Sequence, residues 1–272
     1  MHSGLDFWIT AAKMGSMSNQ VNSLLAGLPS AVKPPPDEPQ GARDSVPGCV
    51  AAGGQDPPAS AESSRVDAVY EQILLRIVRG ELAGGSELKS TRIARELGLS
   101  RTPVVQALQR LAADGIVALA PNKRAVVRPG AENWLVELHE LRELLEPAAA
   151  ARAAERVTEA DLAELDRLAA EAQPHAQPDW MAAAQRFDFA LHLRIADRAG
   201  NFALAQTLRK IWTYKRISYL AAPEPAETLA KGYQEHLALL AALHARDAET
   251  ARAAMLFHLR SAATLRAARN IV

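Results

Sequence analysis

Residues 100–117 read SRTPVVQALQRLAADGIV and carry the clearest structural signal in the chain. The pattern predicts a helix with a polar, cationic start and an apolar back, followed directly by a strand. Ser100 is the expected N-cap, and Pro103 is tolerated in the first turn because a backbone N–H there has no helical partner. Apolar residues at helical spacing form the predicted inner face: Val104, Ala107, Leu108 and Leu111.

The sequence on both sides of this helix predicts a small unit of three helices and a hairpin. Ser90 is the expected N-cap of a shorter helix that Gly98 closes, and Gly80 is expected to end an earlier helix. A helix, a tight turn with glycine, a second helix and a β-hairpin make up a winged helix-turn-helix, whose second helix enters the DNA major groove. The other predicted elements are helices over 64–77 and 91–97 and strands over 116–120 and 125–127.

Composition predicts a chain with two small domains and no membrane span. The 272 residues contain no apolar run of roughly 18 residues, and the single cysteine, Cys49, excludes an intramolecular disulfide and favours the cytoplasm. Residues 1–62 include a Pro-Pro-Pro run at 34–36 and a Gly-Gly pair at 53–54. Such a segment buries too little apolar surface to offset the entropy of ordering, so we predict a disordered tail.

Charge is distributed unevenly, although the net charge is zero. Residues 63–130 hold 11 Lys and Arg against 6 Asp and Glu, whereas residues 131–272 hold 17 against 19 and residues 1–62 hold 3 against 6. A basic module joined to a mildly acidic one suits a part that contacts phosphates and a part that does not. A chance excess of solvated charges explains the numbers equally well on charge alone.

From Glu132 onward the pattern is helical, and abundant Ala and Leu favour helices over strands. Asp179 and Asp247 are expected N-caps, and Gly200 is an expected C-terminal stop. Short connections predict that sequential helices are largely antiparallel neighbours in a bundle. The bundle helices are predicted over 132–156, 159–172, 180–198, 202–221, 226–245 and 248–269.

Polar residues of the two short helices and the hairpin are the candidate DNA contacts. Arg101 stands at the start of the second helix, where recognition helices meet bases, and its guanidinium can pair with a guanine edge. The other cations are placed to reach phosphates or, at the hairpin tip, the minor groove. A lone arginine is more often a solvated surface charge, but several cations within one predicted winged helix-turn-helix favour DNA binding. The candidate set is Lys89, Arg92, Arg95, Arg101, Thr102, Gln106, Lys123 and Arg124.

Four residues of the predicted bundle have metal-ligand chemistry. Asp188 and His192 are four residues apart, so both lie on one helix face. His236 stands 10 residues before the predicted turn at 246–247 and His258 stands 11 residues after it. At ~1.5 Å per residue both lie about 15–17 Å from the turn, so an antiparallel hairpin brings them level. One carboxylate and three imidazoles suit zinc or another first-row divalent ion, although each histidine alone also fits a surface or hydrogen-bonded core role.

Several motifs occur together in the first module: YEQI at 70–73, LGLSRTPV at 97–104, ALQRL at 107–111 and DGIV at 114–117. In this combination the module resembles the GntR family of bacterial transcription regulators, which implies a dimer that binds a palindromic operator. Three positions depart from the family pattern, because Thr91 and Val105 replace usual arginines and Arg124 replaces the wing-tip glycine. We therefore predict an operator that differs from the common family half-site or is bound more weakly.

The bundle carries motifs of its own: ELRELLE at 140–146, AGN at 199–201 after Asp188 and His192, EH at 235–236, and Met255 ahead of HL at 258–259. These are similar to the helical effector (FCD) domain of the FadR-like branch of that family. The resemblance implies that a divalent metal ion, zinc first with nickel or manganese as alternatives, is held by Asp188, His192, His236 and His258. Related regulators place a small organic acid at the ion. We expect its carboxylate to meet Arg142, for which a salt bridge to Glu146 is the alternative.

Three function classes follow. The leading hypothesis is a ligand-responsive transcription regulator, not an enzyme, that binds double-stranded DNA as a homodimer and takes a small carboxylate effector. The second is a metal-dependent enzyme fused to a DNA-binding head, although the sequence shows no Glu or further His poised as a general base beside the ligands. The third is a ligand-free structural DNA binder. We expect a mainly α fold with a disordered tail over 1–62, a winged helix-turn-helix over 63–130, and an antiparallel α-helical effector-binding and dimerisation bundle over 131–272.

Overall fold

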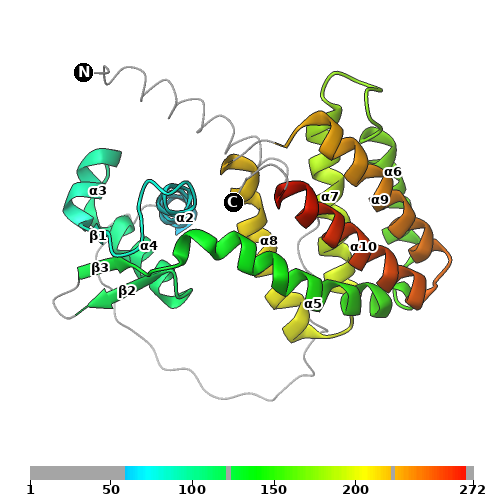
Figure 1. Cartoon of the computed structure of the whole chain (residues 1–272), viewed down its shortest axis with the longest axis horizontal. Coiled ribbons are helices and arrows are strands. Elements are labelled where there is room, and N and C mark those ends of the chain that lie inside the picture. The colour runs from blue at the N-terminus through cyan, green and yellow to red at the C-terminus, as the bar shows by residue number, and fades with distance from the viewer. Residues whose placement is uncertain (1–58, 121–123, 222–223, 268–272) are drawn as a thin grey trace, which may run out of the picture. The chain divides into compact units, whose positions relative to one another are not determined.

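A computed structural model describes residues 59–120, 124–221 and 224–267 (Figure 1). Within these ranges the chain is mainly helical, with a winged helix-turn-helix followed by a helical bundle, so the predicted fold class is confirmed. Most of the predicted disordered tail and Lys123 lie outside the described residues. The proposed domain boundaries stay a prediction. No helix of the described part is long and apolar enough to cross a bilayer.

The first module contains three helices and a small sheet. All strand pairs are antiparallel, and the strand order is β1-β3-β2. The second helix of the pair, α4, buries the predicted inner face, including Val104 and Leu111, which are fully covered. The elements are α2 (Ala59–Val78), β1 (Glu87–Leu88), α3 (Ser90–Leu97), α4 (Arg101–Ala113), β2 (Val117–Ala120) and β3 (Arg124–Val127).

Local details of this module differ from the expectations. Strand β1 was not predicted, because two residues are too few to show an alternating pattern; it exists through pairing with β3, where Leu88 lies opposite Ala125. Ser90 is inside α3 and Lys89 takes the N-cap position, so the predicted Ser90 cap is wrong. Ser100 does stand at the N-cap of α4, without a side-chain capping bond. Gly98 ends α3 with φ +64°, a conformation that favours glycine.

The bundle helices lie within two residues of their predicted ends. Asp247 caps α10 as expected, because its carboxylate accepts the backbone N–H groups of Glu249 and Thr250. Gly200 follows α7 with φ +63°, whereas Asp179 precedes α7 without a side-chain capping bond. The elements are η1 (Ala131–Asn133), α5 (Trp134–Ala154), α6 (Glu159–Glu171), α7 (Trp180–Arg198), α8 (Phe202–Ala221), α9 (Ala226–His244) and α10 (Ala248–Ala267).

Helix α5 is the main packing element of the bundle. It contacts α7, α8 and most extensively α10, which lies beside it in Figure 1. Sequential helices also pack in the pairs α6–α7, α7–α8 and α9–α10. Phe187 on α7 and Trp212 on α8 are among the largest fully buried side chains, so the core lies between these helices. Polar residues that reach this core must therefore find partners inside it.

Helix α8 also contacts the first module. The Lys210 ammonium lies 2.6 Å from the Asp114 carboxylate at the end of α4, and the Tyr70 hydroxyl of α2 donates to the same carboxylate at 2.7 Å. The rings of Tyr70 and Tyr214 are 6.3 Å apart between centroids. One helix thus borders both the bundle core and the helix-turn-helix.

Candidate metal centre and nucleic-acid interface

Three helices bring the four candidate metal ligands together. Asp188 and His192 are one turn apart on α7, His236 lies on α9 and His258 on α10, and all four are buried. The α9–α10 hairpin turns at Arg246, whose φ is +51°. The hairpin brings the two histidines level, which is the juxtaposition that the sequence spacing predicts.

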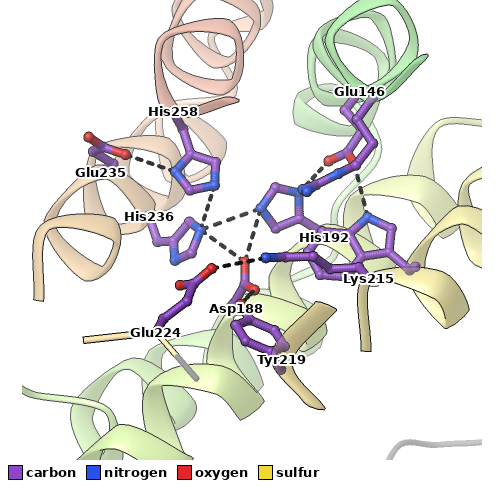
Figure 2. A network of polar contacts seen from close by, with 11 residues as sticks. Glu146, Asp188, His192, Lys215, Tyr219, Glu224, Glu235, His236 and His258 are labelled. Atoms are coloured by element: carbon purple, nitrogen blue, oxygen red, sulfur yellow. Dashed lines mark hydrogen bonds and ion pairs between the residues drawn. The ribbon is translucent and has the colours of Figure 1, made fainter. Parts of the chain in front are cut away.

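The four side chains converge on one point, as Figure 2 shows. The Nε2 atom of His236 lies 3.1 Å from Nε2 of His258, 3.4 Å from Nε2 of His192 and 3.2 Å from Oδ1 of Asp188. The Asp188 Oδ1 atom is also 3.5 Å from Nε2 of His192. One possible ligand atom from each residue lies within 4.8 Å of all the others. A Zn–N bond of ~2.0–2.1 Å puts two tetrahedral ligands about 3.4 Å apart, so the separations fit such an ion.

A second layer of side chains holds the first. The Nδ1 atom of His192 pairs with Oε2 of Glu146, and the Nδ1 atom of His258 lies 2.9 Å from Oε2 of Glu235. A carboxylate that is ionised only accepts, so each of these imidazoles donates its Nδ1 hydrogen and presents a bare Nε2 atom to the centre. The second oxygen of Asp188 accepts a hydrogen bond from the Tyr219 hydroxyl, which leaves Oδ1 for the centre.

Hydrogen bonds alone do not satisfy this arrangement. The Nε2 atom of His236 carries at most one hydrogen, yet it faces acceptors on Asp188, His192 and His258 at 3.1–3.4 Å. A divalent cation at the point of convergence accepts lone pairs from all four groups at once. The donor set therefore fits a resident metal ion of the zinc class, and its histidines would bind through Nε2.

The protonation states match this chemistry. Burial lowers the pKa of His192 and lowers the pKa of His258 well below its usual range, so burial favours the neutral form of both imidazoles. Burial alone would raise the pKa of Asp188, but its hydrogen bond to His236 and the nearby charge of Lys215 hold that pKa well below normal. An ionised carboxylate and neutral imidazoles are the forms that bind metals.

Arg142 is paired inside the protein, as the alternative for this residue anticipated. Its Nε atom donates to Oε1 of Glu146 at 2.5 Å, and its guanidinium lies over the Trp212 ring at 4.3 Å from the centroid. The indole of Trp212 donates to the same Glu146 oxygen at 3.0 Å. Burial would raise the pKa of Glu146, but the charge of Arg142 and the hydrogen bonds from His192 and Arg142 lower that pKa to about 2. The Nη2 atom of Arg142 is buried and has no hydrogen-bond partner among the described residues.

The candidate DNA contacts that the structure describes lie on the surface of the first module. On α4, Arg101, Thr102 and Gln106 are all exposed. Exposed Arg92 and Arg95 lie on α3. Two acidic residues partner some of these cations within the module: Glu96 accepts from Arg92 at 2.7 Å, and Glu87 lies 3.8 Å from Lys89 and 3.6 Å from Arg124. DNA phosphates would compete with these exposed carboxylates.

Comparison with known proteins matches both parts of the chain. Residues 65–127 match the model of bacterial regulatory proteins of the gntR family, and residues 137–261 match the FCD domain. The HTH-type transcriptional regulator McbR of Escherichia coli (strain K12) is 32% identical over 176 residues, which are 64% of this chain and 79% of that protein. The chain belongs to the GntR family. It is a ligand-responsive, DNA-binding transcription regulator with an FCD domain.

Two further proteins resemble this GntR-family regulator. An uncharacterised HTH-type transcriptional regulator of Agrobacterium vitis, from the TAR-I ttuE-ttuC' intergenic region, is 36% identical over 132 residues, covering 46% of this chain and 77% of that protein. The solved structure of E. coli McbR/YncC has a TM-score of 0.54 and 25% identity, and covers 76% of this chain and 98% of that one.

Several site residues of this GntR-family regulator escaped sequence reasoning. Glu235 and Glu146 stand beside the candidate ligands, and each carboxylate is bound to a ligand imidazole. Glu235 could have been suspected from the sequence, because it directly precedes the candidate ligand His236. Glu146 was considered only as a salt-bridge partner of Arg142. Trp212 and Tyr219 on α8 gave no signal, because aromatic residues at helical spacing read as ordinary core.

Proposed function

We propose that this GntR-family regulator binds one divalent metal ion through Asp188, His192, His236 and His258 and senses a small organic acid at that ion. In this proposal the metal-loaded protein binds a palindromic operator as a homodimer in the cytoplasm, and the acid changes the operator affinity. The observation that carries the proposal is the convergence of four buried ligand atoms, from three helices, within 4.8 Å of one another. Zinc is the ion that this donor set favours, with nickel and manganese as alternatives.

The effector class follows from what surrounds the centre. When bound, the ion would supply a Lewis-acidic point. An ion that takes more than four ligands would have coordination positions that the four protein ligands do not fill. A carboxylate oxygen suits such a position. Arg142 supplies the complementary charge, because its buried Nη2 atom remains available for a second carboxylate oxygen while Nε stays on Glu146. We therefore propose a small hydroxy acid or sugar acid as the effector.

The operator contacts are assigned to polar residues of the first module. Arg101 and Gln106 on α4 are proposed to meet base edges, while the remaining cations and Thr102 position the protein on phosphates. A dimer presents two such helices to two half-sites of a palindrome. The proposed set is Lys89, Arg92, Arg95, Arg101, Thr102, Gln106, Lys123 and Arg124.

The test measures bound metal and operator affinity on the same samples. Full-length wild type, His258→Ala and the control His244→Ala, which alters an exposed histidine at the end of α9, are analysed for metal content. Their affinity is then measured for a duplex that the wild type selects from a random DNA library. We expect one ion per chain in the wild type and the control, and loss of the ion in His258→Ala.

The effector is tested by adding a panel of hydroxy acids and sugar acids to the metal-loaded wild type. We expect at least one acid to change operator affinity by about 5-fold or more, the lower end of ordinary allosteric coupling. Absence of any acid binding, or binding without a change in operator affinity, would remove the effector proposal. Retention of the ion in His258→Ala, or a wild type without an ion, would remove the metal proposal.

The enzyme alternative is distinguished by turnover. Glu146 and Glu235 each accept a hydrogen bond from a ligand imidazole, and Glu146 is further bound by Arg142 and Trp212. A general base needs a free lone pair within reach of the substrate proton. We therefore propose that the protein releases or binds its operator without converting the acid; chemical conversion of the acid by the metal-loaded protein would favour the enzyme.

A further inference from the structure

Two glutamates outside the candidate ligand set make specific bonds to two of the ligands. Oε2 of Glu146 on α5 pairs with Nδ1 of His192, and Oε2 of Glu235 on α9 accepts from Nδ1 of His258 at 2.9 Å (Figure 2). All four side chains are at most 9% exposed. Both bonds leave from the ring nitrogen that faces away from the point of convergence.

These bonds fix the chemical form of the imidazoles. A neutral imidazole carries one hydrogen, and a carboxylate on Nδ1 keeps that hydrogen there, so the Nε2 lone pair faces the centre. The bond also fixes the ring plane, since rotation about the Cβ–Cγ axis would break it. A carboxylate partner further raises the basicity of the nitrogen that binds the metal.

The two glutamates differ in their remaining partners. Oε1 of Glu146 accepts from Nε of Arg142 at 2.5 Å and from the indole of Trp212 at 3.0 Å. Glu235 has its other near neighbour in Lys231, one turn earlier on α9, at 3.9 Å. Glu146 thus joins the proposed effector cation to a ligand imidazole, whereas Glu235 stands at the edge of the centre.

We infer that Glu146 and Glu235 are positioning residues that hold His192 and His258 in the Nδ1–H form with Nε2 toward the metal, and that Glu146 also ties the acid-binding Arg142 to the metal ligand His192. This inference rests on the proposed metal site. It assigns the two glutamates different roles: both set metal affinity, and only Glu146 sets the affinity for the acid as well.

The experiment measures zinc affinity of the full-length protein by competition with a chromophoric chelator. The variants are Glu235→Ala, Glu235→Gln and Glu146→Gln, and the control is Glu140→Ala, which removes an exposed carboxylate from α5. We expect Glu235→Ala to weaken zinc binding by about 10- to 100-fold. Glu146→Gln should weaken it by a similar factor, because both Glu146 oxygens accept hydrogen bonds and an amide keeps only one acceptor oxygen. Glu235→Gln recovers much of the affinity, because its amide oxygen still accepts the Nδ1 hydrogen. Glu140→Ala stays within twofold of the wild type.

A second readout separates positioning from a general loss of structure. Nitrogen NMR of zinc-loaded protein with labelled histidines reports which ring nitrogen binds the metal. We expect Nε2 ligation with Nδ1–H for His192 and His258 in the wild type, and loss of the single Nδ1–H form at His258 in Glu235→Ala. If Glu235→Ala does not fold, Glu146→Gln decides through its zinc affinity and the NMR signals of His192.

The outcomes are distinguishable from a failure of the metal proposal. A wild type that binds no ion overturns the proposed metal site and this inference with it. A wild type that binds zinc, with Glu235→Ala and Glu146→Gln within twofold of Glu140→Ala, overturns the inference alone. Binding of the acid selected from the hydroxy-acid and sugar-acid panel is measured on the same zinc-loaded variants, and equal weakening in Glu146→Gln and Glu235→Gln would overturn the separate role of Glu146.

Discussion

Glu146 is a buried carboxylate that joins three helices of the bundle through hydrogen bonds. Its two oxygens take hydrogen bonds from an arginine, an indole and an imidazole, which come from α5, α8 and α7. A buried carboxylate without partners would be strongly destabilising, so the three donors explain how an ionised group is retained at 1% exposure. The planar Arg142 guanidinium both pairs with this carboxylate and stacks on Trp212, a combination that lysine does not provide.

Arg101, at the start of α4, is the residue proposed to contact a base edge of the operator. We expect Arg101→Ala to weaken binding to the selected operator by about 5- to 150-fold and to relax the base preference at one position, because a bidentate base contact is worth ~1–3 kcal/mol. Lys89→Ala should instead weaken binding to all duplexes alike and reduce the salt dependence by about one counterion.

The measurement for both is fluorescence anisotropy with operator and scrambled duplexes at several salt concentrations. Arg252→Ala, an exposed arginine on α10, is the control and is expected to leave both affinities unchanged. An Arg101→Ala variant that loses the same factor on operator and scrambled DNA would show that this residue contacts backbone and not bases.

The sequence predicted the position of a side chain well where helical spacing determined the face on which it lies. Asp188 and His192 share a face because they are four apart, and the equal distance of His236 and His258 from one turn brought them level. The contact between Glu146 and His192 could not be predicted, because the two residues are 46 positions apart in the sequence and their contact depends on how α5 packs against α7. The Arg142 pairing was one of two predicted alternatives, since i and i+4 spacing favours it.

At the scale of elements, Asp161 joins two helices of the bundle. It lies in the first turn of α6, where it forms a capping box with Thr158, and it accepts hydrogen bonds from Arg194 and Arg198 of α7. Its side chain is 2% exposed. Burial would raise the pKa of Asp161, but the hydrogen bonds from Arg198 and Thr158 lower that pKa well below its ordinary value.

We expect Asp161→Asn to lower the free energy of unfolding by roughly 1–3 kcal/mol at pH 7, the range for buried hydrogen bonds to charged groups. The folded pKa is depressed, so the contribution is present above the unfolded pKa of about 3.9 and is lost as pH falls through the folded pKa. Urea unfolding followed by circular dichroism between pH 7 and pH 3 measures it. The wild-type advantage over Asp161→Asn should be constant from about pH 7 to 5 and shrink below about pH 4.

Asp166→Asn alters an exposed carboxylate of the same helix and serves as the control, with an expected change within about 0.5 kcal/mol. A difference between wild type and Asp161→Asn that does not diminish in acid would argue that packing, and not charge, accounts for it. The helix ends themselves followed from periodicity and caps, whereas β1 could not be predicted because only its pairing with β3 defines it.

At the scale of the molecule, the order of modules followed from the sequence, because periodicity changes from a helix–hairpin pattern to continuous helices near residue 131. The packing between modules did not follow. Lys210 on α8 meets Asp114 at the end of α4, a contact across 96 positions that no local pattern encodes. Helix α8 also supplies Trp212 and Tyr219 to the candidate metal centre, so its two roles became visible only in three dimensions.

The metal centre is tested most directly by anomalous X-ray diffraction from crystals of the full-length protein, recorded on both sides of the absorption edge of the ion found by elemental analysis. We expect one anomalous peak per chain, about 2.0–2.2 Å from Oδ1 of Asp188 and from the Nε2 atoms of His192, His236 and His258. A chain without a peak at this position, or an ion bound elsewhere while these four side chains only hydrogen-bond to one another, would contradict the proposed metal-dependent regulator.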